Sequence, residues 1–299
     1  MKRKPIYVEI PVEEDMDRLW KATQEPELHT QWDLRFTSIT YLPREEGEPQ
    51  LFSYKTNIGI MTIEGWGKSA GEHNAKDGSR TSSLHFGTDQ KVSIIREGKG
   101  YWKYKQEGHG ITFLTQYDYE VNFGKIGAFI DRLFFRPMIG WATALSFDVL
   151  RRWLEMGETP ASQYIRFFFS WLIVFLFSFV WLYHGIVPKI VLSHPEEIEA
   201  VTGLLGLSGQ VAANALLLAG ILEGLFGLTW LIYRKKEHLF ALQMILFPLL
   251  TLSILFGDPS DFAHPYNPLT FNAALFVLSI IGYVICKDIP TAKSCKRKK

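Results

Sequence analysis

One glutamate lies in the middle of a long apolar segment, where a carboxyl group has unusual chemistry. Glu223 is the only charged residue within 211–233. An ionised carboxylate that faces lipid is costly, so this side chain must face other helices, be protonated or pair with a polar group. Gly220 and Gly224 flank it with a spacing that permits close helix approach. One interpretation is a site for a proton or a ligand headgroup. The alternative is a protonated glutamate bonded to a neighbouring helix.

A second polar group is expected at the ends of the apolar segments. His184 and Lys189 follow one segment, and His264 and Asn267 precede another. Histidine together with nearby carboxylates can bind a metal ion or an anionic headgroup. No two histidines have the i, i+4 spacing that would indicate zinc, so we predict no metal site. The alternative is that these side chains cap helix ends at the membrane interface. With Glu223, these residues form the candidate polar site of the membrane.

Four apolar segments position these residues, and each is 17–23 residues long: 167–183, 211–233, 239–256 and 269–286. About 20 apolar residues cross a hydrocarbon core of about 30 Å. The segments therefore predict a four-helix transmembrane bundle, and the lipid bilayer is the first predicted partner.

Basic residues predict the orientation of the bundle. Positive loops stay on the cytoplasmic side. Basic clusters precede the first segment, join the second to the third and follow the fourth. Residues 1–12 lack the apolar core of a signal peptide. We therefore expect a multi-pass protein of the cell membrane, with both termini and the soluble domain in the cytoplasm.

Composition excludes several other classes of function. The formal net charge of +1 gives no indication of a nucleic-acid partner. Two cysteines, Cys286 and Cys295, cannot form a disulfide framework. The sequence contains no CxxC, P-loop or dinucleotide-binding glycine motif. No catalytic residue and no cofactor can be named from these patterns.

The first half of the chain has a different pattern. Residues 109–123 alternate between apolar and polar side chains with period two, which is typical of a half-buried antiparallel strand. Shorter alternating runs precede it, and two short helices follow an opening strand at 6–10. Apolar residues then recur every 3–4 positions from 126 to 153, with an interruption expected at Pro137. We predict an α+β helix-grip domain, an antiparallel sheet around a long C-terminal helix, followed by the all-α bundle.

Residues 4–155 resemble the START/Bet v 1-like superfamily, also called SRPBCC or polyketide cyclase/dehydrase-like proteins. The matching stretches are residues 6–11, the helix with Leu19 and Trp20, the start of the last strand at 110–113 and the Arg-Trp-Leu-Glu end of the long helix. The resemblance implies a cavity that binds apolar ligands and no shared catalytic residue. Candidate ligand-binding residues are Trp102, Tyr104, Tyr117, Tyr119, Phe129 and Leu133. The alternative is that these side chains pack as solid core.

Residues 162–289 resemble the DoxX-like family of four-helix membrane proteins. The resemblance rests on the runs 183–189, 194–197 and 264–268, on Glu223-Gly224 and on Pro248. DoxX is named from a subunit associated with a quinol oxidase, so the resemblance implies a membrane fold and leaves a redox role open.

The domain boundaries and two functions follow from these patterns. We expect a ligand-binding domain at 1–157, a linker at 158–164, the membrane domain at 165–289 and a basic cytoplasmic tail at 290–299. One function is a membrane-anchored binding protein for an apolar ligand such as a lipid or quinone. The other is a membrane oxidoreductase accessory, or an enzyme that acts on a quinone or lipid, with a membrane protein as a further partner.

Overall fold

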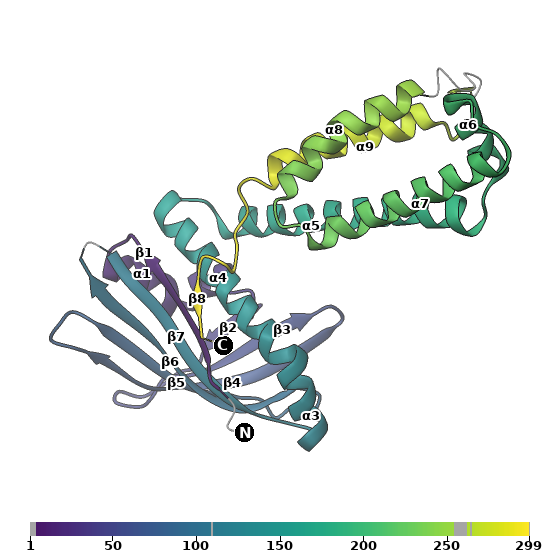
Figure 1. Ribbon diagram of the computed structural model, residues 1–299. Coiled ribbons are helices and arrows are strands. Elements are labelled where there is room, and N and C mark those ends of the chain that lie inside the picture. The colour runs from purple at the N-terminus through teal and green to yellow at the C-terminus, as the bar shows by residue number, and fades with distance from the viewer. Residues whose placement is uncertain (1–3, 109, 254–261, 264, 299) are drawn as a thin grey trace. The chain divides into compact units, whose positions relative to one another are not determined.

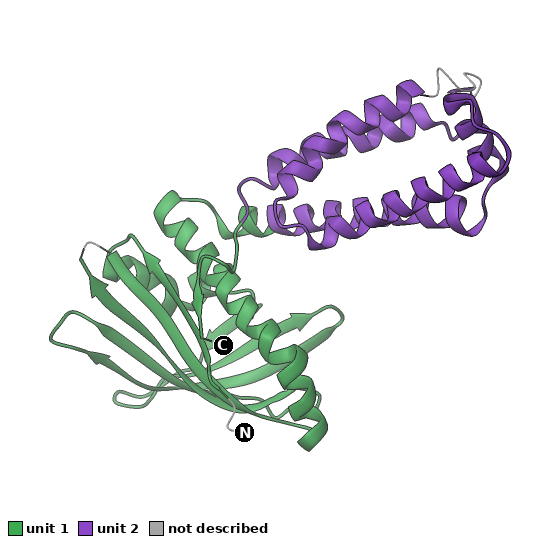
Figure 2. Cartoon of the chain, viewed as in Figure 1, with its two compact units in different colours: residues 1–164, 290–299 green, residues 165–289 purple. Residues whose placement is uncertain are grey.

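The chain forms two compact units in the computed structural model, which describes residues 4–108, 110–253, 262–263 and 265–298. Met1–Tyr164 and Pro290–Lys299 make up the first unit, here called the N-terminal domain, and Ile165–Ile289 make up the membrane domain (Figure 2). The predicted basic tail, residues 290–299, lies in the same compact unit as Met1–Tyr164.

The N-terminal domain is built on one antiparallel sheet with the strand order β2-β3-β4-β5-β6-β7-β1-β8 (Figure 1). The predicted long strand is β7, and it pairs with β6 on one side and β1 on the other. The strands are β1 (Ile6–Val12), β2 (Ser38–Tyr41), β3 (Leu51–Ile58), β4 (Met61–Asn74), β5 (Arg80–Gly87), β6 (Ile95–Glu107), β7 (Gly110–Val121) and β8 (Lys296–Arg297).

Aromatic rings and glycines alternate across the helix-facing side of this sheet. Directly paired residues on neighbouring antiparallel strands share one face, and the pairing places Tyr119, Gly98, Phe86, Gly67 and Phe52 in one row over five strands. A Cβ atom at position 67 would lie 2.0 Å from the Phe52 ring, and one at position 98 would lie 2.5 Å from the Phe86 ring. Both glycines are therefore required for the rings to lie over the sheet. We call this row the aromatic floor.

A long helix crosses the sheet in three consecutive pieces, α3 (Gly124–Ile130), the π-helix η1 (Asp131–Phe135) and α4 (Arg136–Met156). The expected interruption at Pro137 is confirmed, because the π-helix lies directly before it. Proline lacks the N–H that an α-helix needs, and the wider turn accommodates that gap. Two short helices, α1 (Met16–Gln24) and α2 (Pro26–Trp32), follow β1.

The core of the N-terminal domain lies between β1, β6, β7, α2 and α4. Phe113 on β7 stacks on Phe147 of α4 with ring centroids 4.4 Å apart. Trp32, Phe113 and Phe147 are each fully buried. The predicted helix-grip architecture is confirmed, because the sheet and helix cover each other's apolar faces.

Residues 290–297 return to the N-terminal domain and close its free edge. The Thr291 N–H donates to Asp148 Oδ2 at 2.8 Å, and the Cys295 thiol donates to the Ala144 carbonyl at 3.2 Å, both on α4. Strand β8 then pairs with β1. We call this segment the returning tail. It covers the edge of β1 that would otherwise offer unpaired backbone groups.

The described part of the membrane domain is built mainly from helices. They are α5, which begins in the first unit at Pro160 and ends at His184, η2 (Gly185–Val191), α6 (Pro195–Leu205), α7 (Gly209–Ile232), α8 (Lys236–Ser253) and α9 (Pro268–Ile285). Among described residues, the helices apolar and long enough to span a membrane are Gly124–Met156, Pro160–Val191, Gly209–Ile232 and Pro268–Ile285. The first of these packs on the sheet, so it is not a span. Helix α8 is less apolar because it opens on Lys236 and Glu237, and the predicted remainder of that segment, to residue 256, lies outside the described residues.

Aromatic side chains fill the centre of the membrane domain. Phe177 of α5 stacks on Trp230 of α7 at 5.2 Å, and Trp230 packs edge-on against Phe240 of α8 at 4.8 Å. Leu275 of α9 joins the same buried cluster. The four predicted helices therefore pack as one bundle.

Candidate functional site

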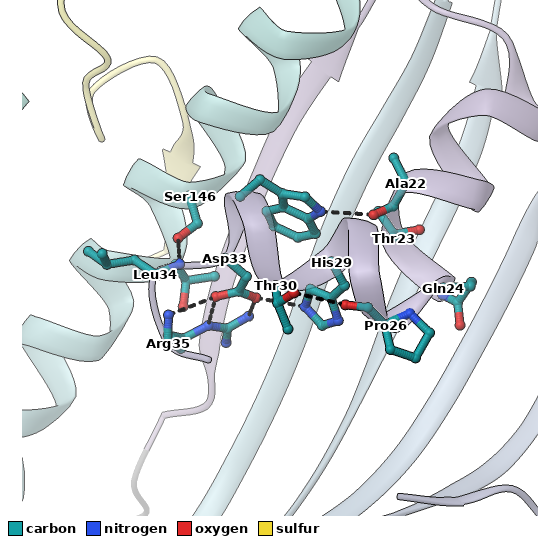
Figure 3. A network of polar contacts seen from close by, with 12 residues as sticks. Ala22, Thr23, Gln24, Pro26, His29, Thr30, Asp33, Leu34, Arg35 and Ser146 are labelled. Atoms are coloured by element: carbon teal, nitrogen blue, oxygen red, sulfur yellow. Dashed lines mark hydrogen bonds and ion pairs between the residues drawn. The ribbon is translucent and has the colours of Figure 1, made fainter. Parts of the chain in front are cut away.

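A buried charged network occupies the loop between α2 and β2 (Figure 3). The Arg35 guanidinium donates to Asp33 through Nε at 2.8 Å and Nη2 at 2.6 Å. Nε2 of His29, one turn earlier on α2, lies 3.0 Å from Asp33 Oδ2. The neighbouring Leu34 N–H donates to Ser146 on α4 at 2.9 Å, which fixes the loop to the long helix.

Charge compensation keeps the buried Asp33 ionised. Its side chain has no solvent exposure, and that of Arg35 is 14% exposed. Burial alone would raise the pKa of Asp33, but the charge and hydrogen bonds of Arg35, with the hydrogen bond from His29, hold it well below its usual value. The Arg35 guanidinium also lies 5.6 Å from the centre of the Tyr117 ring. The network therefore lies beside Tyr117, two residues along β7 from Tyr119 of the aromatic floor.

Four of the six predicted ligand-binding residues lie in the core. Trp102, Tyr104, Tyr117 and Tyr119 are all buried, and the three tyrosine hydroxyls have protein partners. Tyr117 and Thr143 hydroxyls lie 2.9 Å apart, and the Tyr119 hydroxyl donates to Asp131 at 2.6 Å. The Tyr104 hydroxyl lies 2.7 Å from that of Thr23. These bonds fix the rings between the sheet and its helices, as buried hydroxyls require.

The other two predicted ligand-binding residues are exposed. Phe129 is 66% exposed and Leu133 is 54% exposed, both on the first turns of the long helix. The 3.6-residue period of the apolar residues correctly predicted a helix with one apolar face. The period does not determine whether that face contacts the sheet, a ligand or solvent. The ligand-binding role of the six residues stays a prediction.

The membrane domain brings Glu223 and Lys189 together as an ion pair. Lys189 Nζ lies 3.1 Å from Glu223 Oε2 and 3.5 Å from Glu197 Oε1, and it donates to the His184 carbonyl at 3.4 Å. The Lys189 side chain is 12% exposed and that of Glu223 is 22% exposed. Two of the predicted polar side chains therefore form one compact site, with Glu197 as an additional acid that the candidate site residues did not include.

Two glycines, Gly185 and Gly220, create the close helix crossing that this pair needs. A Cβ atom on Gly185 would lie 2.6 Å from the Gly220 carbonyl oxygen and 2.7 Å from the Gly224 nitrogen. Such distances to backbone atoms cannot be relieved by a side-chain rotation. The crossing joins η2 to α7, so the π-helix carries Lys189 to the level of Glu223.

We expect Gly220→Ala to destabilise the membrane domain strongly, whereas Gly224→Ala has little effect. A Cβ at position 220 would meet the Gly185 carbonyl oxygen at 2.6 Å, but one at position 224 has no atom within 4 Å. Thermal unfolding in detergent compares the two. Equal melting temperatures for the two variants would contradict the crossing.

The other predicted polar residues have separate roles or positions. The His184 ring packs 5.5 Å from Phe271 of α9. The Asn267 side chain accepts from the Thr270 N–H at 2.9 Å and caps α9, which agrees with the capping interpretation. His264 lies outside the described residues. Within the described part of the chain, no three His, Cys, Asp or Glu side chains are placed to hold a metal ion.

Sequence reasoning missed a group of buried polar atoms in the bundle. Gln243 of α8 has no solvent exposure, and its amide nitrogen and oxygen have no hydrogen-bond partner among the described residues. The indole N–H groups of Trp181 and Trp230 are likewise buried and unpartnered. The sequence did contain a signal for this group, because Gln243 is a polar residue within the apolar segment 239–256. A buried amide normally requires a hydrogen-bond partner.

Comparisons with known proteins agree with this two-part organisation. The DoxX-like family matches residues 178–280. The chain is 48% identical over 188 residues to the Bacillus subtilis membrane protein YndG, covering 62% of this chain and 70% of that protein.

Solved structures similar to the N-terminal half include a STAR-related lipid transfer protein from Xanthomonas axonopodis, at 15% identity and a TM-score of 0.40, covering 50% of this chain and 84% of that one. Norcoclaurine synthase from Thalictrum flavum is also 15% identical, with a TM-score of 0.34, covering 49% of this chain and 86% of that one. Scores of this size carry no functional argument. The chain belongs to the same family as YndG, and it joins a helix-grip domain to a membrane domain that matches the DoxX-like family over residues 178–280.

Proposed function

We propose that the protein binds an apolar ligand, such as a lipid or quinone, through its membrane-anchored N-terminal domain. The aromatic floor is the observation that carries this proposal. Gly67 and Gly98 let the Phe52 and Phe86 rings lie over the sheet, and both phenylalanines are only half-buried. Half-buried aromatic rings on the helix-facing side of a sheet offer an apolar surface to a ligand. Tyr119 is the β7 member of this row, and Tyr117 lies two residues from it on the same strand.

Extraction of lipid from the purified full chain, followed by mass spectrometry, tests the proposal. A stoichiometric apolar molecule is the expected result. Phe86→Asp places a charge on the aromatic floor and should abolish co-purification while the circular dichroism spectrum stays unchanged. Retention of the ligand by a folded Phe86→Asp variant would contradict binding at the floor.

We further propose four spans with both termini and the N-terminal domain in the cytoplasm. The returning tail supports an even number of crossings. Residues 290–297 pair with β1 and α4, so they must lie on the same side of the membrane as the residues before α5. Three spans would separate them, which supports α8 as the fourth. The basic clusters at 234–236 and 293–299 favour the cytoplasmic side.

Reporter fusions check this topology. We expect fusions after Tyr233 and after Cys286 to behave as cytoplasmic, and fusions within 257–266 as external. The opposite pattern would refute the compartment of the N-terminal domain, and equal behaviour of all three would refute α8 as a span.

A second candidate function is that the bundle itself binds a quinone or lipid. Gln243 and the indole groups of Trp181 and Trp230 favour it, because buried donors without partners fit a carbonyl or hydroxyl oxygen of a ligand. Aromatic rings around them, Phe177, Phe240 and Phe247, suit a flat apolar molecule.

Gln243→Leu distinguishes a ligand of the bundle from a purely structural role. If the amide has no partner, we expect the variant to be more stable by about 1–3 kcal/mol, since an unsatisfied buried group is removed. If the amide holds a ligand, the variant should lose a co-purifying molecule that Phe86→Asp retains. SDS-titrated unfolding and mass spectrometry give the two readouts.

A further inference from the structure

An exposed apolar surface runs along the beginning of the long helix, on the side that the sheet does not cover. We call it the outer helix face. Six apolar side chains make up this face, and five of them are more than half exposed. Their exposures are 71% for Ile126, 66% for Phe129, 65% for Phe134, 54% for Leu133, 52% for Met138 and 39% for Ile130. They recur at 3–4 residue spacing, so they form one stripe on the helix surface.

The opposite side of the same helix is fixed to the sheet. Asp131 is fully buried, accepts the Tyr119 hydroxyl at 2.6 Å and pairs with Arg136 at 3.1 Å. Phe135 packs against the Tyr119 ring at 6.2 Å. These contacts fix the rotation of the helix, so the outer helix face cannot turn inward without breaking a buried ion pair.

The charges beside the outer helix face have one sign. Lys125 and Arg132 are exposed, whereas Asp131, the only acidic residue between positions 121 and 147, is buried and paired. An apolar stripe with basic residues at its border is the pattern of a helix that lies in the interface of an anionic bilayer.

A short connection tethers the N-terminal domain to the bilayer. Helix α4 ends at Met156 and the first membrane helix begins at Pro160, so three residues connect them. A short connection gives a high effective concentration, and weak lipid binding then suffices to keep the surface docked. A second copy fits less well, because a two-fold contact through this face would bring Lys125 and Arg132 of both copies together.

We propose that the outer helix face docks on the surface of the bilayer in which the chain is anchored. Its apolar side chains enter the boundary of the acyl chains, and Lys125 and Arg132 contact anionic headgroups. The helix then lies along the membrane. If the helix stood upright, Phe129 would lie about 40 Å farther from the bilayer than Met156, at a rise of 1.5 Å per residue.

A fluorescent label at Phe129→Cys tests this in the full chain, reconstituted into nanodiscs of phosphatidylcholine and phosphatidylglycerol. Cys286→Ser and Cys295→Ala remove the native thiols. The matched control is Lys99→Cys. Lys99 is exposed on β6 and lies opposite Asp118, which alternates along β7 with the buried Tyr117 and Tyr119.

We expect blue-shifted emission at position 129, and loss of most of that emission when the lipids carry nitroxide groups, with neither effect at position 99. Lys125→Glu with Arg132→Glu should reduce the quenching. Equal emission at positions 129 and 99 would overturn the proposal. A blue shift that nitroxide lipids do not quench would also overturn it, because protein rather than lipid would then cover the face.

Discussion

Asp33→Asn should lower the stability of the N-terminal domain by about 3–5 kcal/mol, the usual loss when one partner of a buried ion pair is removed. The Asp33 carboxylate accepts the Arg35 N–H, Nε and Nη2, and contacts His29. Asparagine keeps the shape but leaves the Arg35 guanidinium with no counter-charge. Thermal unfolding of the full chain, followed by the circular dichroism of the sheet, measures the change.

The pH dependence of this loss has a defined sign. The pKa of Asp33 is lowered in the folded state, so its contribution is complete above the unfolded carboxylate pKa of about 3.9 and is lost as the pH falls toward the folded value. The difference between wild type and Asp33→Asn should therefore persist at neutral pH and shrink only in acid. Asp33→Leu with Arg35→Met is the control, because removing both charges should restore part of the stability. A single Asp33→Asn variant as stable as wild type would show that the pair is not buried in solution.

Lys189→Met should be the most damaging polar substitution in the membrane domain. It leaves Glu223, and the second carboxylate of Glu197, without a cation at a close helix crossing. Removal of one partner of a buried ion pair costs about 3–5 kcal/mol. Glu223→Gln should be milder when Lys189 is present, because Glu197 remains within 3.5 Å of the ammonium group. Unfolding by SDS titration in mixed micelles gives the order of stability.

The double variant separates pairing from packing. Lys189→Met with Glu223→Gln should lose less stability than the sum of the two single variants, because neither charge is then left alone. Additive losses would mean that the two groups do not interact. If Glu223 also handles a proton or a headgroup, Glu223→Gln should fold normally and still fail to restore the phenotype of a deletion strain.

Long regular patterns explain why the fold was predictable from the sequence. Strand β7 alternates over most of its twelve residues, and the long helix repeats its apolar positions over several turns, so each pattern has one consistent structure. The apolar spans are recognisable for the same reason, since their length is set by the bilayer. Among the four predicted spans, α8 has the weakest apolar pattern, because it begins with charged residues.

The features that were not predictable from the sequence depend on contacts between residues far apart in the chain. Strand β8 has two residues, and its partner β1 lies at the other end of the chain, so no local period indicates the pair. Asp33 and Arg35 look like an ordinary polar loop, and they are buried by elements far along the chain, including α4 and β7. Glu223 was predictable as an unusual residue, but its pairing with Lys189 depends on the packing of η2 against α7, which no local sequence pattern indicates.

The returning tail also sets an order on biosynthesis. Residues 290–297 leave the ribosome after all of Ile165–Ile289, so at about 5–20 residues per second the N-terminal domain waits roughly ten seconds for its last strand. During that time the edge of β1 has no partner, and it is open to wrong pairing with other nascent strands. The tail can reach it only if the intervening segment has crossed the bilayer an even number of times. Completion of the sheet therefore requires an even number of crossings, and a chain inserted with one span missing would keep the edge of β1 unpaired.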